Sequence, residues 1–236
     1  MNILITIYQT VLEALFPTSS AEKELFSYTP EQVYTLFPHV SDYSGLAIPL
    51  PNVHSIYTYK DPRVTQLVWN IKYKKSKRAI EIAGYAFGRQ LESQFDMFNK
   101  ENSETIPRPT LLIVPIPISI QRRKERGYNQ CELITDELKQ RDTHKRFLVI
   151  QNLLIRTHHA SRQTLKDRSE RLQSAQGIFD VNEKVLKHML NINPEIQHIP
   201  IVIIDDVITT GSTMKEAIDA LEKAGFTQVH GLSLAH

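Results

Sequence analysis

The chain has 236 residues, of which 41% are hydrophobic and 23% are charged, as is typical of a globular protein with a sizeable core. A net charge of +2 gives no overall excess that would indicate a nucleic-acid or membrane partner. The single cysteine, Cys131, excludes an internal disulfide and a zinc site built from several cysteines, and it is consistent with a reducing, cytoplasmic location.

Residues 1–56 are expected to form an N-terminal helix followed by an irregular cap. Apolar residues recur at helical spacing from Ile3 to Leu15, and the stretch is shorter than the ~20 residues of a bilayer span. Packing on the core is the favoured role for this helix, and a partner surface is the alternative. Five prolines in residues 17–56 are expected to interrupt any long element.

Residues 57–236 alternate between helical and apolar patterns. Short continuous apolar runs are typical of buried strands in a parallel sheet with helices on both faces. This order predicts one α/β domain wound in right-handed crossovers. Four helices are expected: one that begins near Pro62, one from Arg78 to Phe98, one around Cys131 to Leu138, and one that follows Thr213. Four strands are expected, in residues 110–119, 146–156, 199–205 and 227–235.

The stretch "VIIDDVITTGST", residues 202–213, places Asp205 and Asp206 where an apolar strand is expected to end, with both carboxylates turned outward. Ligands of open parallel sheets gather beyond the carboxyl ends of the strands. Two neighbouring carboxylates can accept hydrogen bonds from a vicinal diol. The alternative is that the two aspartates only end the strand.

Small hydroxylated residues follow the acidic pair and lead into a predicted helix. The first amides of a helix have no internal partner, and together with the positive helix end they can hold a phosphate. Thr213 and Glu216 have the spacing of a capping box, so helix capping is the simpler explanation of these residues. The candidate phosphate-binding residues are Thr209, Thr210, Gly211, Ser212 and Thr213.

The joint pattern of four apolar residues, Asp-Asp, two apolar residues, Thr-Thr-Gly and Ser-Thr resembles the phosphoribosyl pyrophosphate (PRPP) signature of type I phosphoribosyltransferases. Further segments are similar to the ComF family, which is linked to DNA uptake in competent bacteria. They are "YTYKDPRVTQLVWNIKYKKSKR" (57–78), "VPIPISIQRRKERGYNQ" (114–130) and "RTHHASRQTLKDRSERLQSAQGIF" (156–179). The resemblance implies a type I phosphoribosyltransferase-like parallel sheet flanked by helices, with a small irregular N-terminal cap.

The resemblance also implies roles for individual residues. Asp205 and Asp206 would orient the ribose and act as the catalytic carboxylates, with Mg²⁺ held through PRPP and no direct protein ligand. Family members commonly carry a cysteine-rich zinc module after a Leu-Phe-Pro stretch. Here "TSSAEKELF" follows Pro17, so no zinc is expected. The pyrophosphate would face Ser119, Arg126 and Gly127, and a hood loop would contribute Gln163 and Arg171.

Two functions remain open from the sequence. One is transfer of phosphoribose from PRPP, or retention of a ribose 5-phosphate ligand, with an acceptor that no segment identifies. The other is a non-catalytic or ligand-regulated accessory protein of DNA uptake that binds single-stranded DNA. In "KYKKSKR" the cations around Tyr73 can follow a phosphate backbone while the ring stacks on a base. A solvated basic face is the simpler explanation of these cations. The candidate nucleic-acid residues are Lys72, Lys74, Lys75, Lys77 and Arg78.

Overall fold

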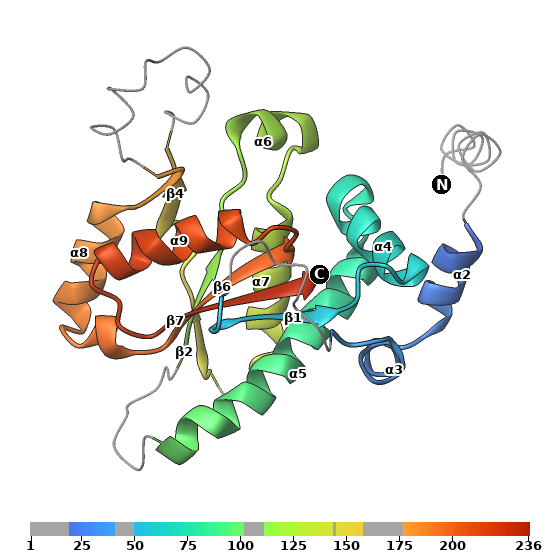
Figure 1. Cartoon of the computed structure of the whole chain (residues 1–236), viewed down its shortest axis with the longest axis horizontal. Helices are drawn as coiled ribbons and strands as arrows, with labels where there is room; N and C mark the ends of the chain where they lie inside the picture. The colour runs from blue at the N-terminus through green and yellow to red at the C-terminus, as the bar shows by residue number, and fades with distance from the viewer. Residues whose placement is uncertain (1–18, 41–49, 102–110, 144, 158–176) are drawn as a thin grey trace.

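The computed structural model describes residues 19–40, 50–101, 111–143, 145–157 and 177–236, and its centre is a parallel sheet (Figure 1). Every neighbouring pair of strands in this five-stranded sheet is parallel. The predicted fold class, a phosphoribosyltransferase-like parallel sheet flanked by helices, is confirmed. In spatial order the strands are β1 (Val53–Tyr57), β7 (Val229–Ala235), β6 (Ile201–Val207), β2 (Leu111–Pro115) and β3 (Phe147–Val149).

Helices cover both faces of the sheet, as its continuous apolar strands require. Successive residues of β6 serve opposite faces: Ile203 packs in the apolar cluster that contains residues of α9, and Ile204 packs in the cluster of α5. The two helical layers therefore pack against opposite faces of β6, which is the central strand of the sheet. The covering helices are α5 (Lys77–Glu101) and α7 (Gln130–Arg141) on one face, and α8 (Glu183–Ile192) and α9 (Ser212–Lys223) on the other.

The N-terminal segment is more regular than predicted. It contains α2 (Ser20–Ser27) and α3 (Pro30–Leu36), and Leu25 and Val33 are buried in the same cluster as α5. Pro30 does not interrupt a helix. It occupies the first turn of α3, where its missing N–H has no helical partner to lose. The boundary expected between residues 56 and 57 falls inside β1, and the helix expected near Ile3 to Leu15 lies outside the described residues.

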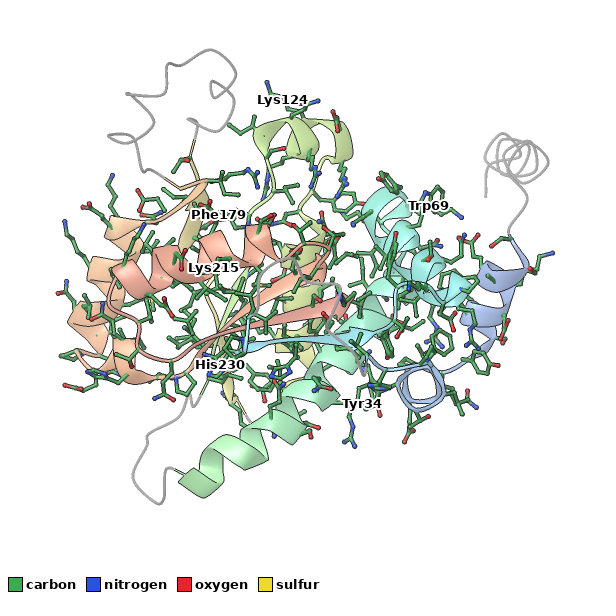
Figure 2. The ribbon with its side chains drawn as sticks, viewed as in Figure 1. Tyr34, Trp69, Lys124, Phe179, Lys215 and His230 are labelled. Carbon is green, nitrogen blue, oxygen red and sulfur yellow. The ribbon has the colours of Figure 1, made fainter. Side chains whose placement is uncertain are left out.

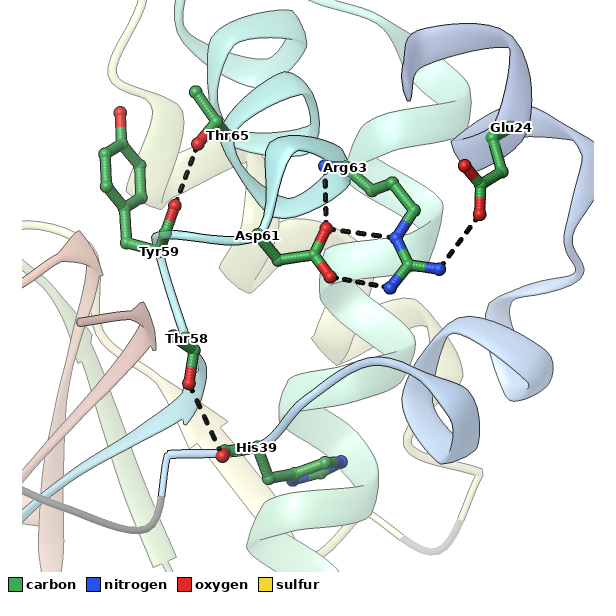
Figure 3. Close-up of polar contacts among 7 residues, drawn as sticks. All are labelled: Glu24, His39, Thr58, Tyr59, Asp61, Arg63 and Thr65. Atoms are coloured by element: carbon green, nitrogen blue, oxygen red, sulfur yellow. Dashed lines mark hydrogen bonds and ion pairs between the residues drawn. The ribbon is translucent and has the colours of Figure 1, made fainter. Parts of the chain in front are cut away.

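Arg63 joins the N-terminal helices to the sheet domain (Figure 3). Its guanidinium donates to both carboxylate oxygens of Asp61, at 3.0 and 2.6 Å, and to Glu24 of α2 at 3.0 Å. The hydrogen bond from Arg63 holds the pKa of Asp61 below its ordinary value. Asp61 also caps α4 (Pro62–Trp69), so the ion pairs of Arg63 with Asp61 and Glu24 hold the start of α4 against α2.

The single strand expected over residues 146–156 is wrong. A turn at Gln151 and Asn152 divides the stretch, so β3 joins the main sheet and β4 (Leu154–Arg156) pairs antiparallel with β5 (Phe179–Val181). This hairpin brings the two ends of the expected hood together. The hood residues Gln163 and Arg171 themselves lie outside the described residues. In the part of the chain that the structure describes, no helix has both the length and the apolar character needed to cross a membrane.

Candidate functional site

The acidic pair lies inside β6. The strand continues to Val207 because β7 pairs with it along its length, with Asp205 opposite Ser233. Both carboxylates are buried, with exposed fractions of 8% for Asp205 and 4% for Asp206. The expectations that the strand ends at the acidic pair and that both charges face solvent are therefore wrong.

Asp205 lines a pocket at the carboxyl end of β6. One of its carboxylate oxygens accepts the amide N–H of Asp206 at 2.8 Å, and the Cys131 thiol lies 3.8 Å from the same atom. Burial raises the pKa of Asp205 to about 8, and the negative charge of Asp206 adds to the rise. Asp205 is thus a buried carboxyl that holds its proton near neutral pH.

Asp206 does not line that pocket and instead engages a lysine. Successive strand residues point to opposite faces, and Oδ2 of Asp206 lies 3.2 Å from Nζ of Lys72. Lys72 belongs to η1 (Asn70–Lys74), a π-helical turn that continues α4. A residue predicted to contact nucleic acid is therefore placed at the acidic pair. The only signal for this position in the sequence was its place in the segment that resembles the ComF family.

The turn after β6 has the geometry of an anion cradle. Gly211 adopts left-handed backbone angles, φ 83° and ψ −10°, and Ser212 begins α9 directly after it. Within the described residues, the amide N–H groups of Thr209, Thr210, Gly211 and Thr213 have no acceptor. Amides of this kind at the positive end of a helix favour an anion. The pocket is lined by Asp205, Val207, Ile208, Thr209, Thr210, Gly211, Thr213 and Met214.

The predicted capping box at Thr213 is wrong. Helix α9 begins two residues earlier than expected, at Ser212, with Gly211 as its N-cap and no side-chain cap. The carboxylate of Glu216 instead accepts the amide N–H of Ile178 at 3.1 Å. The first turn of α9 is therefore attached to the hairpin at the base of the expected hood. With no side-chain cap, the amides at the start of α9 are left available for a ligand.

Replacing Gly211 with alanine is expected to lower the free energy of unfolding by about 1–2 kcal/mol, because a Cβ disfavours left-handed angles. The change should also weaken binding of inorganic phosphate, since relief of the strain would turn the amides away from the pocket. Thermal melts and phosphate titrations measure the two effects. Gly225→Ala is the matched control, since Gly225 is also left-handed but lies just beyond the other end of α9. Equal loss of phosphate affinity in both variants would contradict the prediction.

The residues expected to face pyrophosphate lie on a short helix beside the site. Ile116 donates its amide N–H to Ile204 at 2.9 Å, so the segment after β2 runs next to β6. Ser119 then caps α6 (Ile120–Arg126), a helix that the sequence did not predict, and Gly127 ends it with a left-handed φ of 79°. Arg126 donates to Gln130 at 3.0 Å and lies over the ring of Tyr73. None of the three expected pyrophosphate residues lines the pocket itself.

The other cations of the basic segment are engaged within the chain. Lys74 pairs with Glu22 at 2.6 Å, and both Lys77 and Arg78 pair with Glu81. The fifth, Lys75, lies over the ring of Tyr128 at 5.4 Å. These pairs favour a structural role for the segment over a free cationic surface.

In the ranges that the structure describes, no group of three or more histidine, cysteine, aspartate or glutamate side chains lies close enough together to hold a metal ion.

Comparison with known proteins relates the chain to one family. The model of the phosphoribosyl transferase domain matches residues 164–235. Competence protein ComFC of Bacillus subtilis is 30% identical over 171 residues, which cover 72% of this chain and 58% of that protein. Competence protein F of Haemophilus influenzae is 32% identical over 126 residues, which cover 52% of this chain and 49% of that protein. The chain thus spans less than two thirds of the length of either relative.

A solved structure titled as the allosteric regulatory enzyme of purine biosynthesis aligns at 15% identity with a TM-score of 0.36, covering 70% of this chain and 30% of that one. The domain match, the two relatives and the quoted motifs agree with one another and with the parallel sheet. Together these matches support the ComF family of phosphoribosyltransferase-like proteins as the family of this chain.

Proposed function

We propose that the pocket at the carboxyl end of β6 binds the ribose 5-phosphate part of PRPP. The observation that carries the proposal is the composition of this one pocket. It combines a buried carboxyl at Asp205 with the unpaired amides of Thr209, Thr210, Gly211 and Thr213. The amides suit a phosphate and the carboxyl suits a ribose hydroxyl, which are the two ends of one sugar phosphate.

The proposed chemistry is transfer of phosphoribose to a nitrogen nucleophile. The bond between C1 of the ribose and the pyrophosphate oxygen breaks, its electron pair leaves on pyrophosphate, and the nitrogen lone pair forms the new bond to C1. Asp206, together with Asp205 in its ionised form, would favour the positive charge that develops on the ring. Mg²⁺ held by PRPP would offset the charge of the leaving pyrophosphate.

The leaving pyrophosphate would lie toward α6 in this proposal. The helix follows β2, which neighbours β6 in the sheet, and its cations include Arg122, Lys124 and Arg126. Figure 2 shows Lys124 at the outer end of α6, away from the body of the sheet. Guanidinium groups can donate two parallel hydrogen bonds to phosphate oxygens, so we assign Arg126 rather than Lys124 to the leaving group.

Binding of single-stranded DNA is the second candidate. Trp69 and Tyr73 are exposed, their ring centroids lie 5.7 Å apart, and Lys74 and Arg126 flank them. Exposed rings with neighbouring cations suit base stacking. We rank it second because the segment's cations are mostly engaged by carboxylates. Since both curated relatives are named competence proteins, we extend a cytoplasmic role in DNA uptake to this chain as part of the proposal.

Isothermal calorimetry with PRPP and Mg²⁺ tests the proposal. We expect saturable binding at one site, competed by ribose 5-phosphate. An absence of heat with both ligands would overturn it. The same titration with a single-stranded oligonucleotide at two salt concentrations separates the candidates, because binding to a DNA backbone weakens steeply with salt. Saturation by the oligonucleotide alone would favour the second candidate.

A further inference from the structure

The turn that carries Lys72 is built for a specific geometry. Helix α4 passes into the π-helical turn η1, and the turn ends at Lys75 with a left-handed φ of 50°. Single π-helical turns are rare and occur frequently at functional sites. A left-handed lysine is also unfavourable compared with glycine, so other contacts must hold it.

Tyr128 supplies those contacts. Its hydroxyl donates to the carbonyl oxygen of Ile71 at 2.8 Å and accepts the amide N–H of Lys75 at 3.1 Å. The hydroxyl therefore connects Ile71, inside η1, to Lys75, where the turn ends. Tyr128 is fixed in its own right, because Gly127 ends α6 on one side of it and Asn129 caps α7 on the other.

Lys72 brings the positive charge to the acidic pair. Its side chain is 21% exposed and that of Asp206 is 6% exposed, so water screens the 3.2 Å ion pair only in part. The titratable groups that face one another here are Asp205 and Asp206 from β6, Cys131 from α7 and Lys72 from η1. Of these four groups, only Lys72 is a cation.

We propose that Lys72 is a positioning residue of the ribose site, where its ammonium group neutralises and orients Asp206 so that the acidic pair can accept the hydroxyls of a 5-phosphorylated pentose. The assignment rests on the proposed function. Tyr128 acts one step further out, by holding the π-helical turn that presents Lys72. This explains why a segment far from β6 in the sequence belongs to the site.

The test compares Lys72→Met with Lys74→Met, which changes the same π-helical turn but removes a cation paired with Glu22. Ribose 5-phosphate is titrated by calorimetry from about pH 6 to 9. The charge of Lys72 lowers the pKa of Asp205, so its loss should raise that pKa further. At pH 7 we expect Lys72→Met to bind ribose 5-phosphate about tenfold more weakly for each pH unit by which the pKa of Asp205 rises, because less of this carboxyl is ionised. Its affinity should recover as the pH increases. Lys72→Arg should retain the wild-type profile.

A ligand-free measurement separates this proposal from the proposed function. Carboxyl-carbon NMR should show Asp205 titrating at higher pH in Lys72→Met and unchanged in Lys74→Met. Tyr128→Phe should also raise the pKa of Asp205 and weaken ribose 5-phosphate binding, by less than Lys72→Met does. If thermal melts show that Lys72→Met is unfolded, Tyr128→Phe takes its place in the test. Unchanged titration and affinity in these variants would overturn the role of Lys72 alone. Failure of the wild type to bind ribose 5-phosphate, with the NMR shift present, would overturn the ligand and leave the electrostatic role in place.

Discussion

Replacing Asp205 with asparagine is expected to raise the free energy of unfolding of the ligand-free protein by several kcal/mol at about pH 8, with little change at about pH 4. The pKa of Asp205 is raised in the folded protein to about 8, from an ordinary 3.8, chiefly by burial. A raised pKa means that the folded state binds the proton more tightly than the unfolded state. The stability from this group is complete below the unfolded pKa and is lost as the pH rises through the folded one.

Asparagine keeps the shape and the acceptor for the Asp206 amide but cannot ionise, so the variant avoids that loss. Chemical denaturation at several pH values measures the difference, which should grow by up to about 1.4 kcal/mol per pH unit within this window. Parallel stability curves for the two proteins would contradict the prediction. A gain in stability with a loss of ligand would mark Asp205 as a residue retained for binding at the expense of folding.

Replacing Asp206 with asparagine is expected to weaken PRPP binding by about 1.5–3 kcal/mol, roughly 10- to 150-fold, if a ribose hydroxyl donates to this carboxylate. Loss of the charge also removes the partner of Lys72. Because the lysine side chain can turn its ammonium group toward water, the fold should persist. Calorimetry gives the affinity, and circular dichroism with thermal melts checks the fold.

Asp219→Asn is the matched control for that change. Asp219 lies on α9, where it pairs with Lys215 on the surface, so its replacement should leave PRPP affinity unchanged. Equal affinity of Asp206→Asn and the wild type would remove Asp206 from the site. Equal weakening in both variants would point to a loss of negative charge in general rather than to one hydrogen bond.

The sequence predicts best the parts of this fold whose pattern is local and apolar. The apolar runs that form β2 and the first part of β6 are continuous because both faces of each strand are covered. Helix α6 was missed because it buries no residue, so no apolar face repeats along it. Strands β4 and β5 have three residues each, too few for a pattern to be read, and they exist because they pair with each other.

In the candidate site, too, the sequence predicts the local features and misses those that depend on packing. The carboxyl of Asp205 and the turn at Gly211 are neighbours in the chain, so their joint chemistry is visible in one short stretch. The contact of Lys72 with Asp206 depends on how α4 and η1 pack against the sheet, and a run of lysines carries no sign of which one turns inward. Burial of the acidic pair was missed because the length of β6 depends on β7.

The pairing of β1 with β7 also sets the order in which the protein can fold. Val53 lies opposite Gly231 in a parallel register, so among the described strands the first in the sequence is the neighbour of the last. Sheet pairing across such a separation is slow, because loop closure precedes any gain from the contact. During synthesis β1 therefore lacks its β7 neighbour until β7 has emerged, and an exposed strand edge is a site where nascent chains can associate.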